Sequence, residues 1–226
     1  MRILKIAALM VAIASLAVAM PIVGLYSTGL VAGGGSLSTA GSVEASWVLS
    51  GGTAHVTAGS PSSFPFSYAG SPIWVANNAD SQWISPQTDY YGGGTYPSDA
   101  NGNYTYTLTF DLTGYDSSTA WFSYLVAADN TLTSLTLNGG TIPGGGAGLT
   151  SLSGEYTVNS GFLAGINTIV ATVNNFSENA TGNPTGFRLE VTESDVQSMP
   201  AQVPEPATFA LVGLALAALP VLRRRR

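Results

Sequence analysis

The chain has 226 residues, with seven Lys or Arg, thirteen Asp or Glu and no cysteine. Six of the seven basic residues lie near the two ends, so the segment from Met20 to Met199 carries twelve acidic residues and one basic residue, Arg188, for a net charge of −11. A surface this anionic repels phosphate backbones and excludes nucleic acid as a partner. The absence of cysteine excludes disulfides, thiol catalysis and thiolate metal sites.

The first residues have the pattern of a secretory signal peptide. Arg2 and Lys5 precede an apolar run over 6–18, and Ala17-Val18-Ala19 supplies small residues at both specificity positions of a cleavage site. This order is typical of a signal helix over residues 1–19 that is removed on export. The apolar character continues through Leu25, so a cut as late as residue 32 stays open.

Residues 33–63 are dominated by Gly, Ser, Thr and Ala, and we interpret them as a partly flexible lead-in. The single histidine of the chain, His55, lies there. A Ser-His-Asp site would need this histidine, but no GxSxG nucleophile motif accompanies it. We therefore expect no catalytic residue and interpret His55 as exposed or at a strand edge.

Residues 64–195 are expected to form an all-β domain. Apolar and polar side chains alternate over 104–112 and again over 187–192, where Phe187 points inward and Arg188 and Glu190 share the outer face. Further strands are expected at 44–49, 72–76, 121–126, 132–137 and 167–174. Gly- and Asn-rich turns between them favour an antiparallel β-sandwich.

Four aromatic residues are candidate sugar contacts: Trp74, Trp83, Tyr90 and Tyr91. They lie in a loop-rich stretch with several Asn and Asp residues. Sugars bind by stacking on aromatic rings while amides and carboxylates take the hydroxyls. The same residues also build sandwich cores, and this alternative stays open.

A metal site is the next candidate. Asp99, Asn101 and Asn103 offer oxygen ligands at alternate positions, as a calcium loop begins, but Tyr104 stands where that loop needs glycine. We interpret the segment as a turn. No cofactor is expected, although calcium bound by distant loops remains possible and its ligands are unknown.

The last residues combine three elements. A linker over 196–206 contains Val203-Pro204-Glu205-Pro206, an apolar run covers 207–222, and Arg223-Arg224-Arg225-Arg226 follow. Sixteen helical residues span about 24 Å, slightly less than a bilayer core of roughly 30 Å. The arginines would stay cytoplasmic and leave the preceding domain outside. An ordinary single-pass anchor is the alternative interpretation.

This tail resembles the PEP-CTERM sorting signal of Gram-negative bacteria. The resemblance implies an exosortase, a membrane protease that acts near the Pro-Glu-Pro. It also implies export through the inner membrane, brief anchoring there by the C-terminal helix, and transfer to the cell surface or extracellular matrix.

A second resemblance covers residues 72–192. Its motifs lie in Ala128-Asp129-Asn130, in Leu135 to Gly139, in Phe162 to Ile169 and in Asn183 to Arg188. These segments resemble the galactose-binding-like jelly-roll domains of exported bacterial proteins. The resemblance implies a fold and leaves the function open.

Two classes of function therefore remain. The first is a non-catalytic surface or matrix protein associated with exopolysaccharide. The alternative is a carbohydrate-binding module, with calcium as a possible requirement. A small glycan-active hydrolase is a third alternative, because twelve acidic residues offer many carboxylate pairs.

Overall fold

The computed structural model describes residues 18–57, 66–68, 71–90, 98–145, 147–176 and 182–199. Residues 18–198 form one compact unit. The expected signal helix up to residue 17, the linker from residue 200, the apolar run 207–222 and the arginine block lie outside the described residues. Within the described ranges, no helix is long and apolar enough to cross a membrane.

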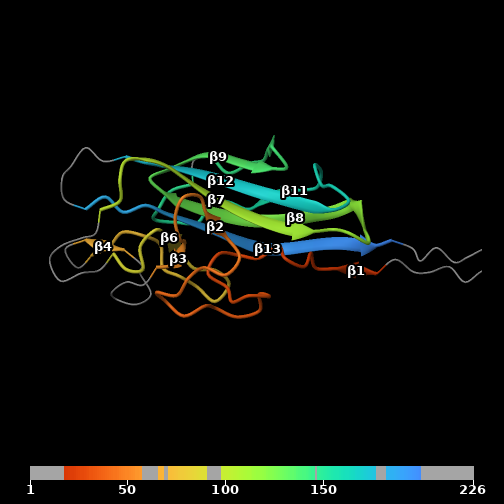
Figure 1. The fold of residues 1–226 in the computed structure, drawn as a ribbon, viewed down its shortest axis with the longest axis horizontal. Coiled ribbons are helices and arrows are strands. Elements are labelled where there is room, and N and C mark those ends of the chain that lie inside the picture. The colour runs from red at the N-terminus through yellow and green to blue at the C-terminus, as the bar shows by residue number, and fades with distance from the viewer. Residues whose placement is uncertain are drawn as a thin grey trace, which may run out of the picture. The chain divides into compact units, whose positions relative to one another are not determined.

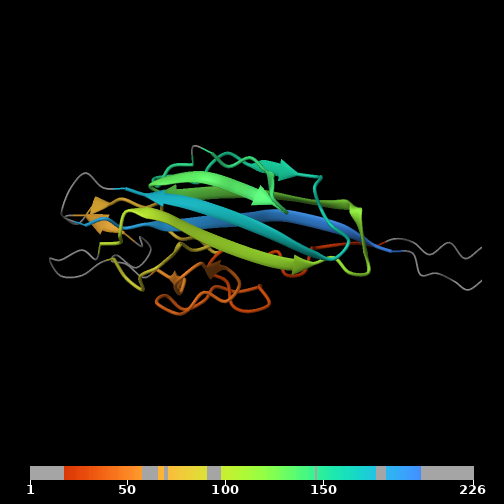
Figure 2. The same cartoon turned by 45° about the horizontal axis from the view of Figure 1, so that its top comes forward.

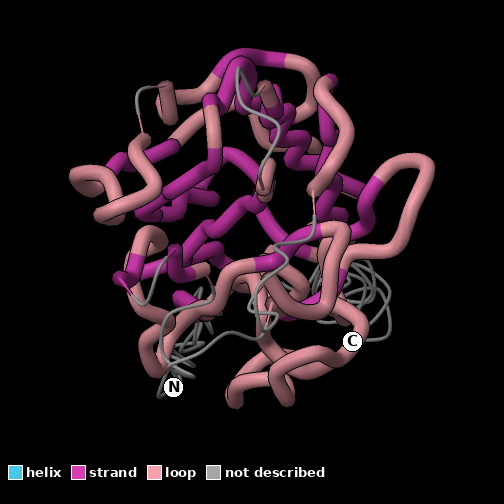
Figure 3. The backbone as a smooth tube through the Cα atoms, turned by 90° about the vertical axis from the view of Figure 1, so that its left-hand side faces the viewer, coloured by secondary structure: helices cyan, strands magenta, loops and turns pink. Residues whose placement is uncertain are grey.

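The described part of the chain is built from antiparallel strands, and Figure 3 draws only strands and loops there. Sheet A has the order β11-β8-β13-β6-β3, with β1 also paired to β13, and sheet B has the order β10-β9-β12-β7-β2. The strands of sheet A are β1 (Ala19–Met20), β3 (His55–Val56), β6 (Ile84–Ser85), β8 (Tyr115–Asp129), β11 (Tyr156–Val158) and β13 (Gly186–Ser198). Those of sheet B are β2 (Val48–Leu49), β7 (Gly102–Asp111), β9 (Thr131–Leu137), β10 (Gly140–Thr141) and β12 (Ile166–Asn175), and β4 (Ser67–Tyr68) pairs separately with β5 (Ser71–Pro72).

The two sheets enclose a common core, the arrangement of a β-sandwich (Figures 1 and 2). The alternation expected over 104–112 is confirmed, because Tyr106, Leu108 and Phe110 are buried on the inner face of β7. They meet Phe122 and Leu189 of sheet A in the same cluster. β7 and β12 pair over ten consecutive residues without a register shift, which gives sheet B a regular centre.

The domain begins earlier than expected. The interpretation of residues 33–63 as a lead-in and of residue 64 as the domain start needs correction over 33–57, because these residues pack against the sandwich. Trp47 is buried and its indole contacts the ring of Phe187 at 5.3 Å between centroids. The carboxylate of Glu44 is also buried and accepts backbone N–H bonds from Gly29 at 2.9 Å and Ser46 at 3.1 Å.

Residues 18–28 follow the free edge of β13. Ala19 pairs with Gln197, the Ile22 N–H donates to Ser194 Oγ at 3.1 Å, and the Thr28 N–H donates to Leu189 O at 2.9 Å. Ile22 and Leu25 enter the main core. The segment therefore satisfies backbone groups of an edge strand and closes one side of the sandwich.

A second apolar cluster covers one half of the outer face of sheet A. It consists of Phe66, Trp74, Trp83 and Tyr90 packed on Ala127 of β8. Sheet A therefore has apolar cover on its inner face along its length and on its outer face over the half near β6. The other half of that outer face, near β1, is not part of this cluster.

Candidate functional site

The candidate sugar contacts lie inside the protein. Trp74 is 1% exposed, and Trp83 and Tyr90 are 0% exposed. The two indoles stack at 4.4 Å between ring centroids, and Tyr90 meets Trp74 edge-on at 5.4 Å. The prediction therefore needs correction for these three residues, since a ring packed on both faces offers none to a sugar. Tyr91 lies outside the described residues.

The polar atoms of these rings are used within the fold. The Trp74 indole N–H donates to Asp129 Oδ2 at 2.7 Å, and that of Trp83 donates to Val75 O at 2.9 Å. Gly186, at the start of β13, makes room for Trp74, because a Cβ at this position would lie 2.4 Å from the indole carbon Cη2. The close fit indicates a structural cluster.

Two buried carboxyl groups lie beside this cluster. The hydroxyl of Tyr90 donates to Asp99, which also accepts the Thr185 N–H at 3.1 Å and the Gln87 side-chain amide at 3.1 Å. Burial raises the pKa of Asp129 to about 6, helped by the charge of Asp99 and opposed by the bond from Trp74. A carboxyl group with such a pKa can serve in acid–base chemistry. Asp129 is only 3% exposed, however, which keeps a substrate away from it.

The segment Asp99–Asn103 forms a turn whose side chains point to separate partners. Asn101 Oδ1 accepts a bond from Asn183 Nδ2, and Asn103 Oδ1 accepts one from Asn174 Nδ2. The three residues therefore do not converge on one point. Among the described residues, no group of three or more His, Asp or Glu side chains is arranged to hold a metal ion.

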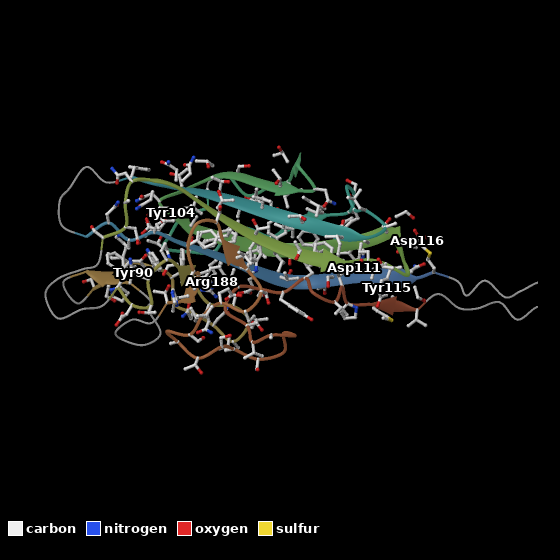
Figure 4. All side chains as sticks on the ribbon, viewed as in Figure 1. Tyr90, Tyr104, Asp111, Tyr115, Asp116 and Arg188 are labelled. Atoms are coloured by element: carbon white, nitrogen blue, oxygen red, sulfur yellow. The ribbon has the colours of Figure 1, made fainter. Side chains whose placement is uncertain are left out.

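Arg188 and Glu190 lie on the same outer face of β13, as expected, and their side chains pair at 3.4 Å. They do not face water: Arg188 is 0% exposed and Glu190 8%. Residues 76–82 cross over them, where Arg188 donates to Ser81 Oγ at 2.7 Å and Ala76 O at 2.7 Å. Burial lowers the pKa of Arg188, while the charge of Glu190 opposes that shift. Figure 4 shows Arg188 at the end of the domain where Figure 1 labels β3 and β6.

Glu190 is satisfied equally well. Its Oε2 accepts bonds from Asn78 Nδ2 at 2.7 Å and Ser81 Oγ at 2.7 Å in addition to Arg188. The pair is thus a closed polar network that fastens residues 76–82 to β13. Alternation predicted that Arg188 and Glu190 share the outer face of β13. No feature of the strand itself indicated that residues 76–82 bury them.

His55 lies on β3 and is half-buried. Its Nδ1 is buried and has no hydrogen-bond partner among the described residues. In a Ser-His-Asp site a carboxylate would hold this nitrogen and orient the ring. The geometry at His55 lacks that feature.

Trp121 differs from the other three tryptophans. All four lie in the described ranges, and Trp121 on β8 is only half-buried, whereas Trp47, Trp74 and Trp83 are buried. The sequence predicts a strand at 121–126, and that strand is confirmed within β8. The strand pattern alone did not indicate that its outer face is open at Trp121.

The terminal signals fall largely outside the described part. Ala19 opens β1, while Ala17, the Val203-Pro204-Glu205-Pro206 motif and the residues Arg223, Arg224, Arg225 and Arg226 lie beyond it. The described residues thus form an anionic, all-β domain with its single arginine buried. Such a domain is joined at Met199 to the segment that contains the sorting motif.

Residues 202–226 match the family model of the PEP-CTERM protein-sorting motif. No curated protein and no solved structure matches the chain. The motif implies that the protein is exported, held transiently at the membrane by its C-terminal segment, processed by an exosortase and transferred to the surface.

Proposed function

We propose that this protein is a non-catalytic surface or extracellular-matrix protein of a Gram-negative bacterium, associated with exopolysaccharide once an exosortase has processed it. The observation that carries the proposal is the sorting motif at residues 202–226. The charge of the exported segment supports it, because a net charge of −11 keeps a domain soluble in a crowded matrix.

The use of the buried polar groups supports the non-catalytic part of the proposal. Asp99, Arg188 and Glu190 are bonded to neighbouring residues of the chain, and Asp129 is held by Trp74. Polar groups that are hydrogen-bonded within the chain hold segments of the fold in place. The release of reducing sugars from host polysaccharide by the purified protein would contradict this part of the proposal.

We also propose that the domain is a galactose-binding-like jelly roll. Two segments that resemble this family are in contact, which supports the assignment. Asn138 Nδ2 donates to Asn167 Oδ1 at 2.8 Å, and Asn138 Oδ1 accepts the Thr168 N–H at 2.9 Å. Asn138 adopts a φ of 52°, a conformation that asparagine tolerates better than most residues. Both segments therefore act as structural turns.

Processing is tested by replacing Pro204, Glu205 and Pro206 together with alanine. We expect the variant to remain in the membrane fraction at its unprocessed length, because the protease loses its recognition segment. Immunoblots of membrane, surface and medium fractions measure this, with Pro200→Ala as the matched control. Release of the triple variant at the wild-type rate would contradict the assignment.

Association with polysaccharide is tested in the host. We expect the processed protein to be retained in the matrix of the normal strain and to pass into the medium of a strain that makes no exopolysaccharide. An equal distribution in the two strains would contradict the association and leave the sorting assignment intact.

A further inference from the structure

A shallow groove lies on the open half of the outer face of sheet A. It has a volume of about 540 Å³, and its lining includes Pro21, Trp121, Glu193 and Asp195. Strand order places Trp121 on β8 at one side, β13 in the middle and Pro21, directly after β1, at the other side. In Figure 1 this is the end where β1 lies against β13, away from β4 and β6.

A β-bulge in β13 determines which side chains of this strand face the groove. The register with β8 shifts between Val191 and Glu193, so Thr192 is the extra residue. Before the bulge the even-numbered Arg188 and Glu190 lie on the outer face. After it the odd-numbered Glu193 and Asp195 do, while Val196 turns into the main core.

The shifted register brings the carboxylates next to the tryptophan. Asp195 pairs directly with Trp121, and Glu193 pairs with Ser123, both across the β13–β8 ladder. Paired residues on one face of an antiparallel sheet have Cβ atoms roughly 5 Å apart. Glu193 is exposed, and Asp195 and Trp121 are half-buried, so all three can be reached from solvent.

Hydroxyl groups border the same surface. Thr192 and Ser194 line the groove, and Thr192 Oγ1 donates to Glu155 Oε1 across β8. An indole, two carboxylates and several hydroxyls are the side chains that saccharides require. Apolar sugar faces stack on the ring, and acceptors take the sugar hydroxyls.

We propose that this groove binds a saccharide without acidic groups, with Trp121 as the stacking surface and Glu193 and Asp195 as acceptors of its hydroxyl or amino hydrogens. The inference rests on the proposed association with exopolysaccharide and assigns it to a site. It makes the protein a carbohydrate-binding module whose contacts differ from those that the sequence suggested.

Charge decides which saccharides can enter. Between Met20 and Met199 the chain has one Lys or Arg, and that residue, Arg188, is 0% exposed. No cationic side chain is therefore available in the groove to pair with a uronate or a sulfate. The two carboxylates would repel such groups, whereas neutral sugars avoid this repulsion and amino sugars would be attracted.

The test uses the full-length protein, purified in a mild detergent, and isothermal titration calorimetry. The probes are dextran and laminarin as neutral glucans, chitosan oligosaccharides as amino sugars, and alginate as an acidic polymer. We expect saturable binding to at least one neutral or amino probe and none to alginate. Trp121→Ala should weaken binding at least tenfold, and Phe176→Ala, which removes a 50% exposed ring elsewhere, should not.

Intrinsic fluorescence supplies an independent measurement. Trp121 is the most accessible of the four tryptophans, so acrylamide should quench it first and the bound saccharide should protect it. Trp121→Phe retains a ring and should keep part of the affinity, which separates loss of stacking from misfolding. Glu193→Gln and Asp195→Asn should each reduce the preference for amino over neutral sugars.

The outcomes separate the site from the proposed function. If wild type and Trp121→Ala bind equally and are equally retained in the host matrix, the groove assignment is overturned and the association stands. If the purified protein binds none of the probes, or prefers alginate, the groove assignment fails whatever the host shows. Loss of retention in Trp121→Ala, with wild-type thermal stability, supports both.

Discussion

The two halves of the outer face of sheet A contain similar residues that have opposite surroundings. Near β6, Trp74, Asp129 and the Arg188–Glu190 pair are covered by residues 66–68 and 71–90. They are bonded to one another or to those residues. Near β1, Trp121, Glu193 and Asp195 lie in an open groove. Figure 4 shows the first half around Tyr90 and Arg188 and the opposite end around Tyr115 and Asp116. Residue type alone thus does not identify a binding surface. Whether another segment of the chain buries the residues determines whether they can bind a ligand.

The free-energy cost of removing polar groups from water differs between the two halves. A charged or polar group removed from water must gain hydrogen bonds that offset its lost hydration. In the covered half Trp74, Arg188 and Glu190 have such bonds, so substitutions there should alter stability. In the open half water remains in contact with the side chains, so substitutions should alter binding and leave stability nearly unchanged.

The largest effect is expected from removing the segment that closes the edge of β13. A chain that begins at Gly33 loses the burial of Ile22 and Leu25 and the hydrogen bonds of residues 20–28 to β13. Each side chain contributes about 1.5–3 kcal/mol, so we expect a loss of about 5 kcal/mol or more relative to a chain that begins at Met20. Denaturant unfolding of the two chains measures this.

The structural role of this segment also predicts where the signal peptide is cleaved. Mass spectrometry of the exported protein should give an N-terminus directly after Ala19. An N-terminus near residue 33 on a stable protein would contradict the structural role of residues 20–28.

Next in size is the Arg188→Ala variant. It leaves Glu190 buried without its cationic partner, and breaking a buried pair in this way costs about 3–5 kcal/mol. Urea unfolding at pH 7 should show this loss. Glu193→Ala, an acidic position in the open half, should stay within about 0.5 kcal/mol of wild type. Similar values for both variants would remove the distinction between the halves.

Asp129 gives a smaller effect that depends on pH. Its pKa in the folded state, about 6, lies above its ordinary value of 3.8, so folding favours the protonated form. Its contribution to stability is complete below pH 3.8 and is lost as the pH rises through 6. The difference of about two pH units corresponds to at most about 3 kcal/mol.

We therefore expect Asp129→Asn, which keeps an acceptor for the Trp74 N–H, to be more stable than wild type at pH 7. It should also lose the decline between pH 4 and 6.5. Thermal unfolding across this range measures both. Asp80→Asn, an exposed control, should keep the wild-type slope. A parallel slope in wild type and Asp129→Asn would show that burial does not perturb this carboxyl group.

The sequence predicted the long strands of the sandwich well because each has a local signal. The strand expected at 72–76 is wrong beyond Pro72, which belongs to the separate pair β4–β5. Alternation over 104–112 predicted the inner face of β7, and the strand expected at 121–126 forms the middle of the longer β8. The lead-in was misinterpreted because its Gly- and Ser-rich composition hid a few buried anchors, chiefly Glu44 and Trp47. Those anchors stabilise the fold through contacts with residues distant in the sequence, and local composition does not report such contacts.

The site could not be predicted for two reasons. The segment over Arg188 and Glu190 comes from residues 76–82, about 110 positions earlier in the chain, and no pattern within β13 records it. The bulge at Thr192 reverses which positions face outward, so strict alternation places Glu193 and Asp195 on the wrong face. Trp74 and Trp83 were candidates because their stretch is rich in loops, Asn and Asp, a local signal that does not report burial.

The most direct test compares Trp121→Ala with Trp74→Ala for saccharide binding and for thermal stability. Trp121→Ala should lose binding and shift the free energy of unfolding by less than about 0.5 kcal/mol. Trp74→Ala should lose about 3–5 kcal/mol, because it empties a buried site, and any protein that remains folded should bind normally. Loss of binding in Trp74→Ala while it stays fully folded, together with normal binding in Trp121→Ala, would contradict the assignment of the two halves.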